Sequence, residues 1–347
     1  MRSGPRRILA WLRMRDRLGR ELRDLRISVT DRCNLRCTYC MPRTTFAPGH
    51  RFLDHRQLLT PEEIERAASA FLTLGVRKIR LTGGEPLLRR EIVEIVQRLA
   101  ALPAEDLALT TNGVLLKRLA GELRDSGLRR ITVSLDTVNA DLFARISDAK
   151  SPLSSVLGGI DAACDAGFFP IKINCVVQRG VNDDDEIIDD LVEYCRARGH
   201  ILRFIEYMDV GTSNGWRAEE MVAGEELVHR VGLRHPLQPL PVTYSGEVAR
   251  RYGFRDGGGE IGIVTSVSRP FCQECTRVRL SADGRLYTCL FSEQGTDLAH
   301  LLRSGASCAD VARTISSVWS DRDDRYSELR GTAAPAGDRV EMSYIGG

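Results

Sequence analysis

Strand-like and helix-like patterns of apolar and polar positions alternate along the first 210 residues. Short apolar runs that end in polar turns predict six strands, and stretches with a helical apolar period follow the first five. The predicted strands are residues 25–29, 77–81, 107–109, 130–135, 170–177 and 201–207. The predicted helices are residues 60–74, 90–101, a segment ending near 126, 140–166 and 184–198. Alternating units of this length imply a parallel sheet with right-handed crossovers.

The polar clusters of this region all follow the strands, which favours a barrel over a flat sheet. In such barrels the chemistry lies at the carboxyl ends of the strands. We therefore expect an α/β fold with a partial (β/α)6 TIM-like barrel over residues 22–240. Residues 211–260 look irregular, and we expect residues 241–347 to form a C-terminal subdomain that covers the barrel. The arginine-rich residues 1–21 predict a flexible N-terminal extension.

The composition is that of an ordinary globular chain, with 43% hydrophobic and 28% charged residues and a formal net charge of +2. So small a charge argues against a general nucleic-acid binder, which needs a strong basic excess. No apolar run approaches the roughly 18–20 residues that cross a bilayer, and the apolar patch near the start is too short for a signal peptide. We expect a cytoplasmic protein that binds neither nucleic acid nor a membrane.

Six of the ten cysteines fall into two groups, one spaced C-x3-C-x2-C and the other C-x2-C-x13-C. The first group is Cys33, Cys37 and Cys40, and the second is Cys272, Cys275 and Cys289. Disulfides are disfavoured in a cytosolic chain of this size. We expect the four scattered cysteines to be buried thiols that act as small hydrophobic residues. They are Cys164, Cys175, Cys195 and Cys308.

Each group offers three thiolates, whereas structural zinc normally needs four ligands. His50 and His55 are too loosely spaced from Cys40 to complete a zinc finger. Three cysteines on a [4Fe–4S] cluster leave one iron without a protein ligand, and an open iron can bind a further group. The first group therefore favours a cluster. For the second group, zinc with a remote ligand remains an alternative of nearly equal weight.

Three of the predicted strands carry a cation where a strand buried on both faces should be apolar. These cations are Arg26, Arg80 and Lys172. Asn174 shares the face of Lys172 by the strand period of two, and Arg277 and Arg279 share a face beside the second cysteine group. Each cation alone could be explained by edge exposure or a salt bridge. Together they favour a polyanionic ligand in the barrel lumen, because buried unpaired charges are costly.

The octapeptide CNLRCTYC at residues 33–40 resembles the signature of the radical S-adenosylmethionine superfamily. The cysteine spacing, the aromatic residue before the last cysteine and the position just after the first strand all match. The sequence TGGEP at residues 82–86 resembles the second element of that superfamily, whose glycines let the backbone approach the methionine moiety closely. The resemblance implies a partial barrel of the radical S-adenosylmethionine type.

Within this superfamily the chain resembles the GTP 3′,8-cyclase family, which catalyses the first step of molybdenum cofactor (molybdopterin) biosynthesis. The resemblance covers roughly residues 22–347 and includes the spacing of the second cysteine group. It rests on residues 25–33, 110–113, 133–136, 203–208 and 271–291, and on the closing Gly346-Gly347.

The resemblance implies two [4Fe–4S] clusters with different tasks. Cys33, Cys37 and Cys40 would hold the cluster that chelates S-adenosylmethionine. Cys272, Cys275 and Cys289 would hold the cluster that meets the guanine of GTP. The implied S-adenosylmethionine contacts are Tyr39, Gly84, Ser134 and Met208. The implied GTP contacts are Arg26, Arg80, Thr111, Lys172, Arg277, Val278 and Arg279.

The implied reaction is that of a lyase in which the cofactor-derived radical, and no side chain, does the chemistry. A 5′-deoxyadenosyl radical would take hydrogen from C3′ of the ribose, and the carbon radical would attack C8 of the guanine. The product would be (8S)-3′,8-cyclo-7,8-dihydroguanosine 5′-triphosphate. The resemblance also implies an electron donor, transfer of the product to cyclic pyranopterin monophosphate synthase, a homodimer and a Gly-Gly tail that reaches the active site.

Two other functions compete with this interpretation. Another twin-cluster radical S-adenosylmethionine enzyme, acting on a different phosphorylated or peptide substrate, would share the first cysteine group. Peptide-modifying types, however, carry longer C-terminal cysteine arrays than the three found here. A non-enzymatic zinc-binding protein would leave the TGGEP element and the charged strands unexplained.

Overall fold

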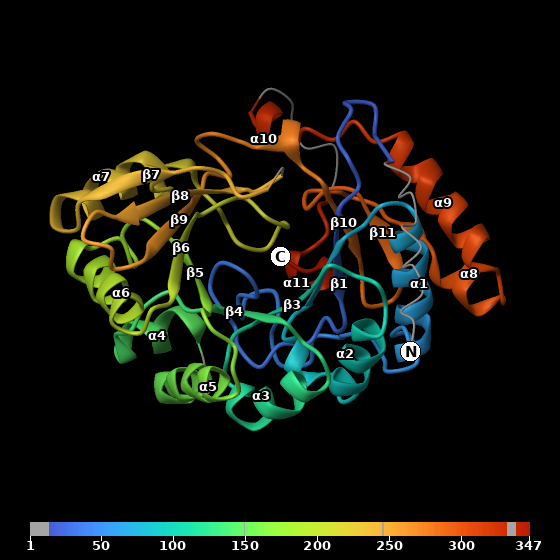
Figure 1. The fold of residues 1–347 in the computed structure, drawn as a ribbon, viewed down its shortest axis with the longest axis horizontal. Coiled ribbons are helices and arrows are strands. Elements are labelled where there is room, and N and C mark those ends of the chain that lie inside the picture. Colours follow the sequence, from blue (N-terminus) through green and yellow to red (C-terminus); the bar gives the residue numbers. More distant parts are fainter. Residues whose placement is uncertain (1–13, 149, 245, 332–337) are drawn as a thin grey trace, which may run out of the picture.

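A single open sheet of twelve strands dominates the fold (Figure 1). The computed structural model describes residues 14–148, 150–244, 246–331 and 338–347. The strand order in this part of the chain is β12-β11-β10-β1-β2-β3-β4-β5-β6-β9-β8-β7. The central strands, from β10 through β1–β6 to β9, are parallel, and the outer strands are antiparallel. The sheet is therefore a partial barrel, extended at both edges by strands from the C-terminal part.

All six predicted strands are present. They are β1 Asp24–Ser28, β2 Lys78–Thr82, β3 Asp106–Thr111, β4 Arg130–Ser134, β5 Lys172–Val177 and β6 Ile201–Glu206. The later strands are β7 Leu237–Leu240, β8 Ala249–Phe254, β9 Glu260–Val264, β10 Arg277–Leu280, β11 Arg285–Tyr287 and β12 Thr296–Asp297. Because β9 pairs with β6 and β10 pairs with β1, the segment after residue 240 continues the sheet on both sides of the barrel.

The predicted helices are also present, with one division. The helices after the first five strands are α1 Pro61–Thr73, α2 Ile92–Ala100, α3 Leu116–Asp125, α4 Ala140–Ser147, α5 Leu153–Asp165 and α6 Asp185–Ala197. A capping box begins α1, in which Thr60 accepts from the Glu63 amide and the Glu63 side chain accepts from the Thr60 amide. The helix expected over residues 140–166 is two helices, because Asp148 adopts a left-handed conformation and Pro152, which is extended, is the N-cap of α5.

The segment expected to be irregular, residues 211–260, contains α7 Gly224–Arg234 together with β7 and β8, so that expectation was wrong. The remaining helices are α8 Ala299–Arg303, α9 Cys308–Ser320, α10 Tyr326–Leu329 and α11 Met342–Ile345. Short 3-10 turns lie at η1 Pro86–Leu88, η2 Ala218–Glu220 and η3 Cys272–Glu274. None of the helices in the described ranges is long and apolar enough to cross a membrane.

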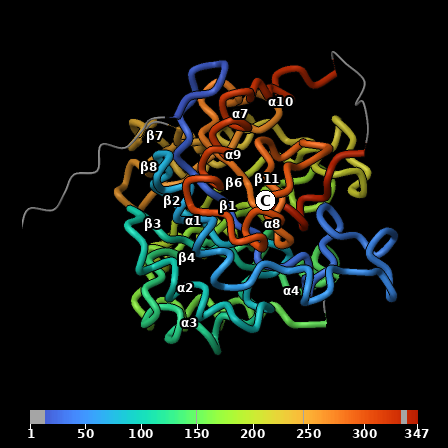
Figure 2. The backbone as a smooth tube through the Cα atoms, turned by 90° about the vertical axis from the view of Figure 1, so that its right-hand side faces the viewer, coloured from blue at the N-terminus to red at the C-terminus, as the bar shows by residue number. Residues whose placement is uncertain are grey.

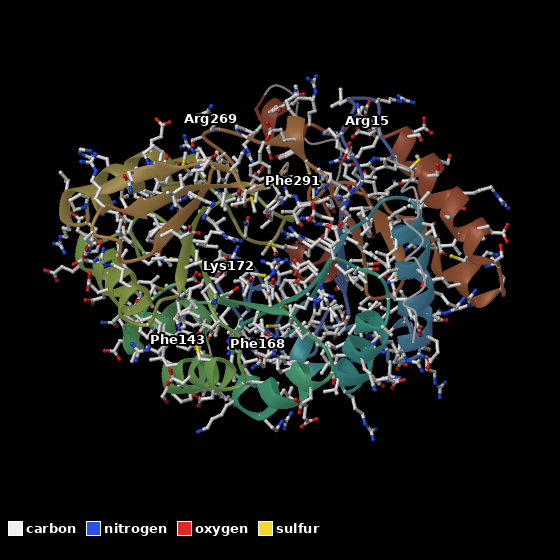
Figure 3. All side chains as sticks on the ribbon, viewed as in Figure 1. Arg15, Phe143, Phe168, Lys172, Arg269 and Phe291 are labelled. Atoms are coloured by element: carbon white, nitrogen blue, oxygen red, sulfur yellow. The ribbon has the colours of Figure 1, made fainter. Side chains whose placement is uncertain are left out.

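The hydrophobic core lies between the outer face of the sheet and the surrounding helices. Alternate strand residues such as Ile79 and Phe204 are fully buried there, against helix residues such as Phe71. In Figure 3 the labelled Phe143 and Phe168 lie on this helical side, whereas Lys172 lies toward the inside of the arc of strands. The inner face is therefore the polar face, and it holds the cationic residues found in the sequence.

The N-terminal segment differs from the expected flexible extension. Residues 1–13 lie outside the described residues, but residues 14–21 pack on the C-terminal part of the chain (Figure 2). Arg17 pairs with Asp321 at 3.0 Å, and the Trp319 indole donates to the Arg20 carbonyl at 3.3 Å. The extension predicted over residues 1–21 thus does not hold for residues 14–21, because buried partners near residue 320 order them.

Candidate active site

The first cysteine group lies in the loop that follows β1, at the carboxyl edge of the sheet. This loop packs on the TGGEP element that follows β2: the Gly84 amide donates to the Thr30 carbonyl, and the Glu85 amide donates to the Arg32 carbonyl, both at 2.8 Å. A Cβ on Gly83 or Gly84 would come within 2.4 Å of the same loop backbone. Only glycine fits at this approach, so the second element fixes the backbone next to Cys33.

A buried carboxylate organises the floor of this loop. Glu85 is 1% exposed, and its carboxylate accepts hydrogen bonds from the Thr111 hydroxyl and the Asn112 amide, both at 2.7 Å. Burial raises the pKa of Glu85 to about 7, although these donors oppose the shift. The Asn112 side chain in turn donates to Asn34 at 2.8 Å. Thr111, predicted to contact GTP, is therefore occupied here in holding Glu85.

Tyr39 joins the first cysteine group to the opposite wall of the barrel. Its hydroxyl donates to Asp136, which follows β4, at 2.8 Å, and the other oxygen of Asp136 accepts from the Val176 amide of β5 at 2.8 Å. Burial raises the pKa of Asp136 to about 6, and both donors counteract that shift. The cysteine loop is thus attached to β4 and β5 as well as to β1 and β2.

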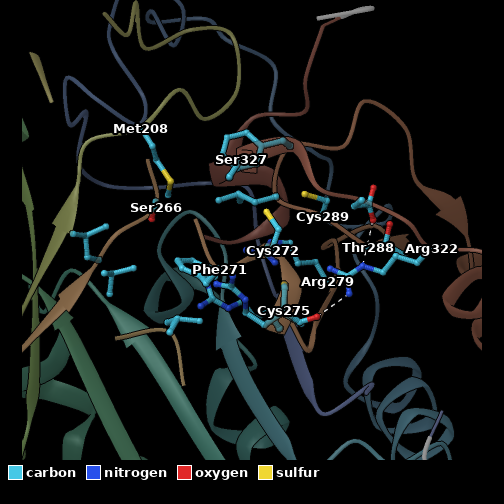
Figure 4. Close-up of a pocket in the computed structure, with 18 of the residues that line it drawn as sticks. Met208, Ser266, Phe271, Cys272, Cys275, Arg279, Thr288, Cys289, Arg322 and Ser327 are labelled. Atoms are coloured by element: carbon cyan, nitrogen blue, oxygen red, sulfur yellow. Dashed lines mark hydrogen bonds and ion pairs between the residues drawn. The ribbon is translucent and has the colours of Figure 1, made fainter. Parts of the chain in front are cut away.

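The second cysteine group lines a cavity that Arg26 of β1 and Arg203 of β6 also line (Figure 4). Cys272 begins η3, Cys275 directly follows it, and Cys289 follows β11. These three cysteines line a cavity of about 850 Å³, counting its open mouth, together with the predicted S-adenosylmethionine contact Met208. Burial opposes ionisation of Cys275, yet the guanidinium groups of Arg277 and Arg322 outweigh it and lower the pKa of this thiol to about 6.

Cations form a row across the inner face of the sheet. The register places Arg26 of β1 directly beside Arg80 of β2 and beside Arg279 of β10. Like charges on adjacent strands repel, because neighbouring strands lie about 5 Å apart. No carboxylate of the described residues lies within 4.0 Å of these cations, nor of Lys172 or Arg277. The lumen therefore carries a concentrated positive charge that no carboxylate of the described residues contacts.

Unsatisfied polar atoms mark the same region. The Nε atoms of Arg277 and Arg279 and the Oδ1 atom of Asn174 are buried without a hydrogen-bond partner among the described residues. Burial, followed by repulsion from Arg203, lowers the pKa of Lys172 to about 7. Buried polar groups usually have partners, so the arginine Nε donors match an anionic ligand, and Asn174 Oδ1 matches a hydrogen-bond donor on it.

Sequence reasoning missed two lumen residues. Arg203 lies beside Asn174 in the register of β6 and β5 and lines the same cavity. Arg130 begins β4 and pairs with Asp106 of β3. The signal was present for Arg203, which sits between the apolar Leu202 and Phe204 in the way that Lys172 sits between two isoleucines.

The other predicted contacts have different surroundings. Ser134 ends β4 beside Asn174, on the inner face. Val278 aligns with Leu25 and is 1% exposed in the apolar core, so its side chain cannot reach a ligand in the lumen. Among the scattered cysteines, Cys175 and Cys195 are buried as expected and Cys164 is half-buried. Cys308 begins α9 and is exposed, so the prediction was wrong there.

The C-terminus lies inside the arc of strands (Figure 1). Ile345 of α11 is fully buried, and a Cβ on Gly346 would come within 2.2 Å of the Thr82 side chain. Tyr344 donates to Asp283 at 2.5 Å. Gly346 therefore approaches the carboxyl end of β2, the strand that the TGGEP element follows.

Two family models match the chain, the radical SAM superfamily over residues 27–192 and Molybdenum Cofactor Synthesis C over residues 200–328. Together with the fold and the cysteine loop they define a radical S-adenosylmethionine protein, a class that carries a [4Fe–4S] cluster and uses S-adenosylmethionine. A GTP 3′,8-cyclase of Acidothermus cellulolyticus is 54% identical, and one of Staphylococcus haemolyticus is 43% identical; each match covers 96% of this chain and 99% of the relative. The chain belongs to the GTP 3′,8-cyclase family.

Solved structures show the same fold at low identity. Streptococcus suis SuiB bound to its precursor peptide SuiA superposes with a TM-score of 0.64 at 15% identity, over 90% of this chain and 68% of SuiB. At that identity the likeness describes the partial barrel alone. The second family model begins at residue 200, so the division that we expect at residue 240 remains a proposal.

Proposed function

We propose that this chain converts GTP to (8S)-3′,8-cyclo-7,8-dihydroguanosine 5′-triphosphate, the first step of molybdenum cofactor biosynthesis, inside the barrel between the two cysteine groups. The observation that carries the proposal is the row of Arg279, Arg26 and Arg80, which no carboxylate within the described ranges pairs with. A triphosphate supplies enough negative charge for such a row, and guanidinium groups bind phosphate oxygens through paired hydrogen bonds. We choose GTP as the triphosphate because the relatives are named GTP 3′,8-cyclase.

The chemistry of both cysteine groups fits iron–sulfur clusters. Cys33, Cys37 and Cys40 lie on a loop that four strands hold in place, and we assign the first [4Fe–4S] cluster to them. We assign a second [4Fe–4S] cluster to Cys272, Cys275 and Cys289, where the nearby guanidinium groups favour the thiolate of Cys275. When bound, the first cluster with S-adenosylmethionine supplies a 5′-deoxyadenosyl radical, and the second supplies an open iron for the purine.

The side chains then hold and enclose the reactants. Arg26, Arg80, Lys172, Arg277 and Arg279 hold the triphosphate, and we add Arg203 to this set. Tyr39, Gly84, Ser134 and Met208 line the S-adenosylmethionine site. Thr111 stays a proposed GTP contact whose hydroxyl donates to Glu85 here, and Val278 acts through its backbone. The tail with Gly346 closes the carboxyl end of the barrel and excludes water, which protects a radical from side reactions.

Several partners follow from this function as further proposals. The reaction needs an electron donor, and its product passes to cyclic pyranopterin monophosphate synthase. We propose a cytoplasmic homodimer without nucleic-acid or membrane partners. The domain division keeps residues 22–240 as the barrel and residues 241–347 as the segment with the second cluster.

An anaerobic assay with GTP, S-adenosylmethionine and a reductant tests the proposal. We expect 5′-deoxyadenosine and the cyclised nucleotide from the reconstituted protein, with about eight iron and eight sulfide per chain. Arg26→Ala should raise the KM for GTP, whereas Arg313→Ala, which removes a surface partner of Asp310, should behave as wild type. Stoichiometric zinc in place of iron would refute the proposal, and a Cys272→Ala variant with normal turnover would refute the role of the second cluster.

A further inference from the structure

A buried charge network lies directly behind the second cysteine group. Its centre is Asp16, whose side chain is fully buried and accepts from Arg20 Nε at 2.6 Å and from Arg322 Nη1 at 3.2 Å. The two arginine side chains are each 1% exposed. Asp16 and Arg322 are 306 residues apart in the sequence, so the network joins the two ends of the described chain.

Both arginines donate to the backbone of predicted cluster ligands. Arg20 Nη1 donates to the Cys272 carbonyl at 2.8 Å, and Arg322 Nη1 donates to the Cys275 carbonyl at 2.8 Å. The carbonyls at the two ends of η3 are therefore turned toward the network. In Figure 4 Arg322 lies on one side of the three cysteines and Met208 on the other, and Arg322 also lines the cavity beside this loop.

The network is itself held rigidly. Asp16 Oδ1 also accepts from the amides of Leu18 and Arg20, at 3.0 and 2.9 Å, which folds residues 16–20 around the carboxylate. The guanidinium of Arg322 stacks over the Trp319 ring at 4.5 Å. A buried charge is tolerated only when it is paired and hydrogen-bonded, and each member here meets that condition. Such an arrangement fixes the direction in which its donors point.

We propose that Arg20 and Arg322, bridged by Asp16, are positioning residues that hold the Cys272–Cys275 loop in the shape that binds the second cluster. The inference rests on the proposed second cluster and assigns to residues 14–21 a function in retaining it. The three thiol side chains need fixed mutual positions to share one cluster, and the loop that carries two of them has its backbone anchored at both cysteines. Loss of either anchor frees that backbone and accelerates loss of the cluster.

The test uses the full chain with Cys33, Cys37 and Cys40 all changed to alanine, so that iron reports only the second group. After anaerobic reconstitution this parent should hold about four iron. In that background Arg322→Met should lose iron to a chelator at least about tenfold faster, as expected when a charge-assisted hydrogen bond is removed. Arg322→Lys keeps a cationic donor and should recover part of the retention.

A matched control separates positioning from general packing. Arg66 also donates to two backbone carbonyls, those of Leu302 and Ala306, but it braces helices away from the cysteines. Arg66→Met should release iron at the parental rate. With the second cysteine group changed to alanine instead, Arg322→Met should leave the first cluster and its absorbance unchanged, a result that general unfolding would not give.

The outcomes distinguish the two proposals. If the parent with three alanines binds no iron, the second cluster itself is refuted, together with this inference. If the parent holds its iron and Arg322→Met releases it at the parental rate, the second cluster stands and the positioning role is wrong. If Arg322→Met fails to fold, Asp16→Asn takes its place, because it keeps the size of the side chain. Asp16→Asn should release iron faster than the parent. Iron release at the parental rate would overturn the inference.

Discussion

Replacing Gly84 with alanine tests how the TGGEP element shapes the first cysteine group. A Cβ on Gly84 would lie 2.4 Å from the carbonyl oxygen of Arg32 and 2.9 Å from that of Asp31. Both oxygens belong to the backbone just before Cys33. Backbone atoms cannot move out of the way by a change of rotamer. The loop before Cys33 must therefore shift by about 1 Å to make room for the methyl group.

The magnitude follows from this clash. Overpacking of this kind costs about 1–3 kcal/mol, which is roughly a 5- to 150-fold loss in the population of the native loop. The retreat also lengthens the hydrogen bonds from the Gly84 and Glu85 amides to Thr30 and Arg32, both now 2.8 Å. We therefore expect weaker binding of S-adenosylmethionine and faster loss of iron, with little change in the rest of the fold.

The assay uses a chain whose second cysteine group is changed to alanine, so that iron content and S-adenosylmethionine binding report the first group alone. Gly121→Ala is the matched control, because a Cβ on this residue of α3 meets no atom within 4 Å. Alanine in a helix interior should stabilise this control by about 0.5–1 kcal/mol and leave both readouts unchanged. If Gly84→Ala also keeps parental iron retention and cofactor affinity, close backbone approach is not what positions the cysteine loop.

Three further substitutions test a buried amine, a buried hydrogen bond and a helix N-cap. Burial, followed by repulsion from Arg203, lowers the pKa of Lys172 from its ordinary value of 10.5 to about 7. At pH values between these two, Lys172 is protonated in the unfolded chain and largely neutral in the folded chain. The free energy of unfolding of the ligand-free protein should therefore rise with pH across that window, and denaturant titrations should find a smaller rise in Lys172→Met. Tyr39→Phe removes the 2.8 Å hydrogen bond to the buried Asp136 carboxylate, and calorimetry should find a loss of about 1.5–3 kcal/mol; an unchanged transition would contradict that bond. Ser307→Ala removes the capping box of α9 and should cost about 0.5–2 kcal/mol in denaturant titration, whereas Ser307→Gly should cost only a few tenths; equal losses would argue against the cap.

Local patterns were sufficient for the barrel strands because each strand is a short apolar run between turns. Arg26, Arg80 and Lys172 interrupt the apolar pattern that a buried strand should have. The structure places all three on the inner face of the sheet. Arg203 satisfies the same rule, because it lies between the apolar Leu202 and Phe204. Residues 211–260 were harder, because the prolines and glycines around β7 and β8 resemble those of a loop.

Contacts between segments far apart in the sequence cannot be predicted from the local pattern of apolar and polar positions. The pairing of Asp16 with Arg322 spans nearly the whole chain, so residues 14–21 read as an arginine-rich extension. The hydroxyl of Thr111 could serve a ligand or a neighbouring carboxylate, and only the fold shows that it donates to Glu85. Composition suggested burial for Cys308 as for the other scattered thiols, but its position at the start of α9 exposes it.

Strand register also sets the distance between the two halves of the proposed site. Thr132 of β4 pairs with Lys172, and Ser134, two residues further along, pairs with Asn174. At about 3.3 Å per residue, the S-adenosylmethionine contact Ser134 lies roughly 7 Å closer to the carboxyl edge than the cation that we assign to the triphosphate. A nucleotide whose phosphates meet Lys172 and Arg80 must therefore extend its sugar toward the first cysteine group. A slip of one residue in β4 or β5 would turn these side chains toward the helices, so the register that buries Val133 and Ile173 also faces the proposed substrate contacts into the lumen.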